Sequence, residues 1–139
     1  MLRLSNLADY GVVVMTAAAH MAKRGRLTSA SEIAVQTGIP GPTVAKLMGL
    51  LARAELLVSH RGNAGGFSLA REAGAIDLAE IVEAIDGPIV LTHCADGGHE
   101  CTLHGHCAVK PHWDPVNRAV RNALADVSLA ALLPQKVNA

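Results

Sequence analysis

The placement of the cysteines constrains this chain more than any other feature of its sequence. All three, Cys94, Cys101 and Cys107, lie within residues 93–107, with six and then five residues between them. A Gly-Gly pair interrupts the first gap, and glycine disfavours regular helix. The stretch is therefore predicted to be a loop that folds back on itself and lets three sulfur atoms converge on one point.

An odd number of cysteines argues against a disulfide framework, which needs paired thiols and an oxidising compartment. Residues 1–6 also contain no uninterrupted apolar run of the secretory type, so we expect a cytoplasmic protein. In a reducing compartment, thiolates more often hold a metal or act as nucleophiles. No Cys-x-x-Cys pair occurs, which disfavours a thiol redox enzyme, and we expect no enzymatic activity.

Three cysteines and one further ligand suit either tetrahedral zinc or an iron–sulfur cluster. Zinc ligands usually come in pairs two to four residues apart, so the longer gaps here favour the cluster. Redox-active thiols or a chance grouping are the other interpretations. Histidines of the same loop could also coordinate a metal, although a histidine-dense loop is equally typical of solvent exposure: His93, His99, His104 and His106.

Charge divides the chain into two parts, although the formal net charge is zero. Residues 1–75 hold eight Lys and Arg against four Asp and Glu, a balance of +4, and residues 76–139 hold four against eight, a balance of −4. A basic first half suggests contact with a polyanion. No apolar run approaches the roughly 18 residues that a membrane span needs, so no membrane partner is expected.

The first half has the pattern of three helices followed by a hairpin. Residues 4–22 have apolar side chains at helical spacing, and Ser5 is a suitable N-cap. A second helix is predicted to begin with a capping box at 29–32 and to end at Gly38. Pro42 suits the first position of a third helix. The buried face of that third helix is expected to contain Val44, Leu47, Met48 and Leu51.

Two helices joined by the tight turn 37–41 make a helix-turn-helix, whose second helix enters the major groove of DNA. Residues 56–61 and 67–69 then read as two short strands joined by a glycine-rich turn, which is a wing. His20 and His60 are expected to be ordinary surface histidines. The residues predicted to contact DNA are Pro42, Thr43, Lys46, Arg61, Gly62, Asn63, Gly65 and Gly66.

The second half is predicted to contain a helix, the cysteine loop and a long final helix. Asp77 and Glu80 form a capping-box-like pair at the start of the first helix. Asp114 is expected to cap the long helix, with Pro115 at its first position. A narrow seam of small apolar residues along that helix permits close approach of a second helix, either in the same domain or in a second subunit. A short last helix is expected to follow at 128–133.

At these motifs the sequence resembles the Rrf-type winged-helix transcription regulators, a family that includes the regulators of the Isc and Suf iron–sulfur assembly systems. The resemblance rests on LRLS at 2–5 with DYG at 9–11, RGNAGGFSL at 61–69, and the three cysteines followed by Trp113. The longer first cysteine gap and the Pro-His-Trp run at 111–113 are most similar to the Suf-system branch.

The resemblance implies a mainly helical winged-helix fold, with DNA binding in residues 1–75 and a cluster loop and dimerisation helix in residues 76–139. It implies a homodimer that binds a pseudo-palindromic operator as a repressor of cluster-assembly or redox and iron response genes. A 2Fe–2S or 4Fe–4S cluster on Cys94, Cys101 and Cys107 would change operator affinity. The alternative is a structural zinc site without a sensing role.

The fourth ligand is where the sequence departs from the family pattern. In the Isc regulator a histidine follows the last cysteine by three residues, and here that position is Lys110. In the nitric-oxide-sensing repressors of the family, an aspartate near the start of the first helix is donated by the other subunit. Asp9 matches that position. His112, His106 and a small-molecule or solvent ligand are the alternatives.

Overall fold

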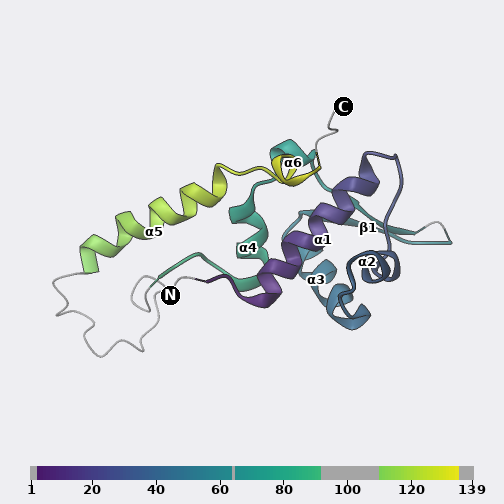
Figure 1. Ribbon diagram of the computed structural model, residues 1–139, viewed down its shortest axis with the longest axis horizontal. Coiled ribbons are helices and arrows are strands. Elements are labelled where there is room, and N and C mark those ends of the chain that lie inside the picture. Colours follow the sequence, from purple (N-terminus) through teal and green to yellow (C-terminus); the bar gives the residue numbers. More distant parts are fainter. Residues whose placement is uncertain (1–2, 64, 92–109, 135–139) are drawn as a thin grey trace.

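The computed structural model describes residues 3–63, 65–91 and 110–134 (Figure 1). The three cysteines and the loop histidines therefore lie outside the described residues. Within the described part, no helix is both long enough and apolar enough to cross a lipid bilayer. In chain order the elements are α1 (Asn6–Ala22), α2 (Ala30–Thr37), α3 (Gly41–Arg53), β1 (Leu57–His60), β2 (Gly66–Leu69), the 3₁₀ turn η1 (Ala73–Ala75), α4 (Leu78–Asp86), α5 (Lys110–Ala125) and α6 (Leu129–Leu132).

Helix α1 begins where its sequence predicts. Ser5 is the N-cap, and its Oγ accepts a hydrogen bond from the Ala8 N–H at 3.0 Å. Gly11 lies on the buried side of α1, where a Cβ atom would come within 2.9 Å of the Ile85 side chain on α4. The absence of a side chain at Gly11 therefore allows α1 and α4 to pack closely, and α1 runs across the middle of the molecule (Figure 1).

Helices α2 and α3 form the predicted helix-turn-helix. Ser29 Oγ accepts from the Glu32 N–H at 3.2 Å at the start of α2, and Gly38 ends that helix with a positive φ of 77°. Glycine adopts this left-handed conformation without steric cost, which explains the sharp turn into α3. Pro42 occupies the second position of α3 rather than the first, because Gly41 begins the helix.

The hydrophobic core collects apolar side chains from helices of both halves of the chain. All four residues predicted for the inner face of α3 are fully buried, and they pack with α1, α4 and α6 in one cluster. Burial of this kind stabilises a fold by about 1.5–3 kcal/mol for each large side chain. The largest members are Met15, Ile33, Leu47, Met48, Leu51, Leu56, Ile76, Ile81 and Leu129.

The wing is an antiparallel hairpin in which Leu57 pairs with Leu69 and His60 with Gly66. A third segment, at Thr28, also pairs with the wing, and its pairing was not predicted from the sequence. The Thr28 N–H donates to the Phe67 carbonyl at 3.0 Å, and the Phe67 N–H donates back to the Thr28 carbonyl at 2.7 Å. This bridge attaches the base of the wing to the residue before the N-cap of α2.

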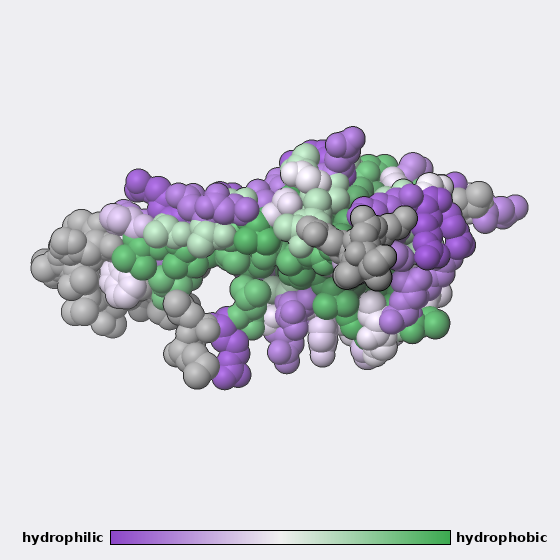
Figure 2. Space-filling model, turned by 45° about the horizontal axis from the view of Figure 1, so that its top comes forward, coloured by the Kyte–Doolittle hydropathy of each residue, from purple (hydrophilic) through white to green (hydrophobic). Residues whose placement is uncertain are grey.

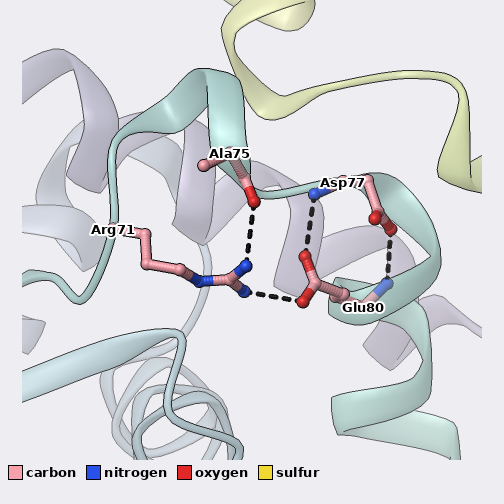
Figure 3. Close-up of polar contacts among 4 residues, drawn as sticks. All are labelled: Arg71, Ala75, Asp77 and Glu80. Atoms are coloured by element: carbon pink, nitrogen blue, oxygen red, sulfur yellow. Dashed lines mark hydrogen bonds and ion pairs between the residues drawn. The ribbon is translucent and has the colours of Figure 1, made fainter.

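A polar network connects the end of the wing to α4 (Figure 3). The predicted capping box is confirmed: Asp77 Oδ1 accepts from the Glu80 N–H at 2.9 Å, and Glu80 Oε2 accepts from the Asp77 N–H at 3.1 Å. Arg71, just after β2, donates to Glu80 Oε1 at 2.6 Å and to the Ala75 carbonyl at 2.9 Å. Glu80 therefore stabilises both the start of α4 and the turn that precedes it.

The predicted start of the long helix is wrong. α5 begins at Lys110, so Pro115 lies inside it rather than at its first position. A proline inside a helix lacks the N–H for the bond to the residue four positions earlier, here Pro111, and its ring crowds the carbonyl of that residue. The turn in front of Pro115 therefore forms in spite of a local cost of about 3 kcal/mol.

The chain returns to the main body after α5. The predicted short last helix is α6, and Ser128 is its N-cap rather than its first residue: the Ser128 Oγ accepts from the Ala131 N–H at 3.2 Å. The backbones of Asp77 and Ser128 form a short antiparallel bridge, in which the Leu129 N–H donates to the Ile76 carbonyl at 2.8 Å. Both ends of the second half are thus attached to the same core, while α5 projects away from it (Figure 1).

We predict that Asp77→Ala lowers the free energy of unfolding by about 0.5–2 kcal/mol, because the Glu80 N–H loses its acceptor. Urea denaturation followed by circular dichroism measures the change. Asp114→Ala removes an exposed carboxylate from α5 and serves as the matched control. Equal unfolding midpoints for the two variants would contradict a stabilising role for this cap.

Candidate DNA interface and surroundings of the cysteine segment

The exposed face of α3 holds the helical residues predicted to contact DNA. Pro42 and Lys46 are exposed and Thr43 is half-buried, whereas the opposite face of the helix is fully buried. Thr43 and Lys46 lie three residues apart and therefore share one side of the helix. An ammonium group and a hydroxyl so placed can donate hydrogen bonds to phosphates or to base edges in a groove.

The wing tip presents Arg61, Gly62 and Asn63 to solvent. Two of its predicted DNA-contacting glycines have an internal structural reason to be glycine. A Cβ atom at Gly65 would lie 2.6 Å from the His60 carbonyl oxygen, and one at Gly66 would lie 2.8 Å from the Thr28 carbonyl oxygen. These glycines shape the tip, while Arg61 and Asn63 carry the side chains that a groove could meet.

Two wing features were not predicted as part of the interface. The His60 ring Nε2 lies 2.8 Å from Ser68 Oγ across the two strands, so this exposed histidine has a local partner. Thr28 supports the wing through its backbone and is 1% exposed. A single bridging residue is too short a stretch to produce the alternation by which strands are recognised in sequence.

The elements that carry the predicted DNA contacts gather at one end of the molecule. In Figure 1, α2, α3 and the tip of the hairpin lie together, and the start of α5 lies at the opposite end. Helix α4 contacts α1, α3 and α5, and so connects the two ends within the described part of the chain. The contacts among these helices are for this reason part of the candidate site.

Asp9 lies in the first turn of α1 and is exposed. A carboxylate in that position is also stabilised by the positive end of the helix dipole, so its location suits either role. Among the described residues, no group of three or more His, Cys, Asp or Glu side chains is placed to hold a metal ion. The proposed thiolate ligands lie in residues 92–109, between Leu91 and α5.

Polar contacts hold the segment before the cysteines, residues 86–91, against two helices. Ser5 Oγ donates to Asp86 Oδ1 at 2.8 Å, which joins the start of α1 to the end of α4. Asn117 on α5 accepts from the Leu91 N–H at 2.8 Å. One turn further along α5, Arg121 pairs with Glu83 of α4 at 2.6 Å.

A mainly apolar groove of about 590 Å³ lies between this segment and α5. Its walls include Val82, Ile89, Val120 and Leu124, and Arg3 and Asp86 lie at its polar part. Figure 2 shows apolar side chains gathered on the α5 side of the molecule, below a band of hydrophilic ones. An apolar groove of this kind is a candidate site for a ligand or for another protein or subunit.

Comparison with known proteins places this architecture in a family. The family model described as Rrf2, iron-dependent transcriptional regulator, matches residues 4–135. The HTH-type transcriptional regulator IscR of Xenorhabdus nematophila is 29% identical over 132 residues, which cover 95% of this chain and 79% of that protein.

Solved structures agree with the family match. CymR, the global cysteine regulator of B. subtilis, has 28% sequence identity and a TM-score of 0.72, and the match covers 95% of this chain and 96% of that one. T. potens IscR has 26% identity and a TM-score of 0.70, over 94% and 85% of the two chains. The predicted winged-helix fold is confirmed, and the relatives are regulators rather than enzymes. This chain belongs to the Rrf2 family of transcriptional regulators.

Proposed function

We propose that this chain is a homodimeric, DNA-binding repressor whose operator affinity depends on an iron–sulfur cluster held by Cys94, Cys101 and Cys107. One observation carries the proposal. A helix-turn-helix with an exposed, basic face occupies one end of the molecule, and all three cysteines fall in the single segment that joins α4 to α5. The description of the family as iron-dependent supports iron as the metal.

Residues 1–75 form the proposed DNA-binding part. The first turns of α3, with Pro42, Thr43 and Lys46, enter the major groove, and the wing tip meets an adjacent groove through Arg61 and Asn63. Gly65 and Gly66 leave no room for a side chain, Gly62 has a positive φ of 109°, and all three would let the backbone of the tip lie close to the DNA. The positive balance of this part of the chain favours association with the phosphate backbone.

Residues 76–139 form the proposed sensing and dimerisation part. Three thiolates are a donor set that iron–sulfur clusters use, and one coordination position remains for a further ligand. When bound, such a cluster supplies iron that reacts with oxidants or nitric oxide and can be lost. We assign the chain to the Suf-like branch, with cluster-assembly or redox and iron response genes as its targets.

The fourth ligand in this proposal is Asp9 of the second subunit. An oxygen ligand exchanges more readily than a thiolate, which suits a site that must react or open. Asp9 lies at the N-terminal end of α1, where Ser5 is hydrogen-bonded to Asp86. With Asp9 as its ligand, the cluster would be joined directly to α1, the helix against which the DNA-binding part packs.

The second subunit would cover the groove beside α5. Val120, Ala123 and Leu124 form an apolar side of this helix next to the groove, and small residues permit close helix packing. A two-fold dimer would also place two helix-turn-helix units on the half-sites of a palindromic operator. Dimerisation and DNA recognition are therefore linked by symmetry.

We predict that Arg61→Ala weakens operator binding by about 1–3 kcal/mol if Arg61 reads a base edge. Lys46→Ala should weaken binding. If Lys46 contacts one phosphate, the slope of log affinity against log salt concentration should also become smaller by about 1. Electrophoretic shift titrations at several salt concentrations measure both effects. Arg118→Ala, an exposed cation on α5, is the control and should bind like wild type. Wild-type affinity in both test variants would exclude this interface.

We predict that replacing any one of Cys94, Cys101 or Cys107 by Ala abolishes or sharply destabilises the cluster. The fold should survive, because the described core draws on other residues. Iron and sulfide assays on protein purified without oxygen measure the cluster, and circular dichroism measures the fold. A colourless wild-type protein that contains zinc would support the structural-zinc alternative, and Cys107→Ala with full iron and sulfide would refute the three-thiolate site.

We predict that Asp9→Ala changes the iron environment and shortens the lifetime of the cluster in air. Mössbauer and resonance Raman spectra of protein prepared without oxygen, compared with wild type, report on the ligand directly. Asp126→Ala, another exposed carboxylate, is the control. If spectra and lifetime are unchanged in Asp9→Ala, the aspartate serves only the start of α1, and His106, His112 or an exogenous ligand takes its place.

A further inference from the structure

Asn117 is one of the two polar residues that are buried in the described part of the structure. Its side chain lies on the inner face of α5 and is 8% exposed. Oδ1 accepts a hydrogen bond from the Leu91 N–H at 2.8 Å, across 26 positions of the chain. Leu91 is the last described residue before the cysteine segment, and α5 begins directly after that segment. The bond thus joins the residue before the segment to a point about two turns inside the helix that follows it.

This bond is one of three polar contacts that hold residues 83–91. Ser5 holds Asp86 from α1, Arg121 holds Glu83 from α5, and Asn117 holds Leu91. Asn117 and Arg121 are four residues apart and lie on the same side of α5. The Arg121 pair is exposed, so solvent screens it, whereas the Asn117 bond is partly buried, with its acceptor on a residue that is 8% exposed.

The amide of Asn117 is costly where it lies. Its Nδ2 is buried and finds no hydrogen-bond partner within the described part of the structure. An unpaired buried donor is unfavourable, so packing alone would favour an apolar side chain at this position. What an asparagine supplies here, and an apolar side chain does not, is the oxygen that accepts the hydrogen bond from the Leu91 N–H.

We propose that Asn117 is a positioning residue that fixes the start of the cysteine segment on α5 and thereby couples the state of that segment to DNA binding. This inference rests on the proposed cluster-dependent function. Because the bond joins Leu91 to α5, a displacement at the segment is passed to the helix. Without this hydrogen bond, the start of the cysteine segment and α5 are connected mainly by nonspecific apolar contacts and by the backbone.

The test compares Asn117→Leu with Asn122→Leu, which makes the same replacement at an exposed asparagine of the same helix. In the full-length protein we expect the Leu91 amide to exchange with solvent deuterium about tenfold faster in Asn117→Leu and at the wild-type rate in Asn122→Leu. Both variants should keep the wild-type circular dichroism spectrum. A Leu91 amide that stays protected in Asn117→Leu would overturn the inference. If Asn117→Leu does not fold, Asn117→Ala removes the same acceptor without added bulk.

The second readout is the ratio of operator affinities between protein purified without oxygen and the same protein after iron removal by a chelator. We expect Asn117→Leu to reduce the wild-type ratio by about fivefold or more, and Asn122→Leu to preserve it. An unchanged ratio in Asn117→Leu would refute the coupling role and leave the proposed function intact. No difference between the two forms of wild type would instead refute the proposed function, and the coupling role with it.

Discussion

The close packing of α1 against α4 is the contact on which the rest of the structure depends. It exists because Gly11 has no side chain where Ile85 approaches. On the same helix, Val14 and Met15 are fully buried in the core that also holds α3. Helix α1 therefore packs against the DNA-binding elements on one side and against α4, the helix that precedes the cysteines, on another. A large movement of either one would disturb its contacts with α1.

The two halves differ in how their contacts are made. The helix-turn-helix rests on a continuous apolar core, and interiors of this kind are tightly packed and resist deformation. Ile85 still packs against this core, whereas residues 86–91 and α5 are joined to the rest by the polar contacts of Ser5, Arg121 and Asn117 beside an open groove. A rigid head joined to a more lightly held second part is an arrangement in which binding at one end can shift the other.

Local signals were the reliable guide to the elements. Ser5, Ser29 and Asp77 all cap the helices predicted to follow them, because a cap depends only on residues three positions apart. The predicted helix start at Pro115 is wrong, because proline is typical of the first helical position whereas α5 contains Pro115 in its interior. The wing glycines remain predicted DNA contacts, and at Gly65 and Gly66 neighbouring carbonyl oxygens give a second reason for glycine.

The sequence by itself determined the helices up to α4 to within about a residue at their starts, the inner face of α3, the hairpin and the grouping of the cysteines, because these follow from periodicity, capping and composition. Only the tertiary structure revealed the Thr28 bridge, the groove beside α5 and the bond between Asn117 and Leu91. Each of these joins residues far apart in the chain. Such contacts depend on how whole elements pack, and no local pattern of residue types encodes them.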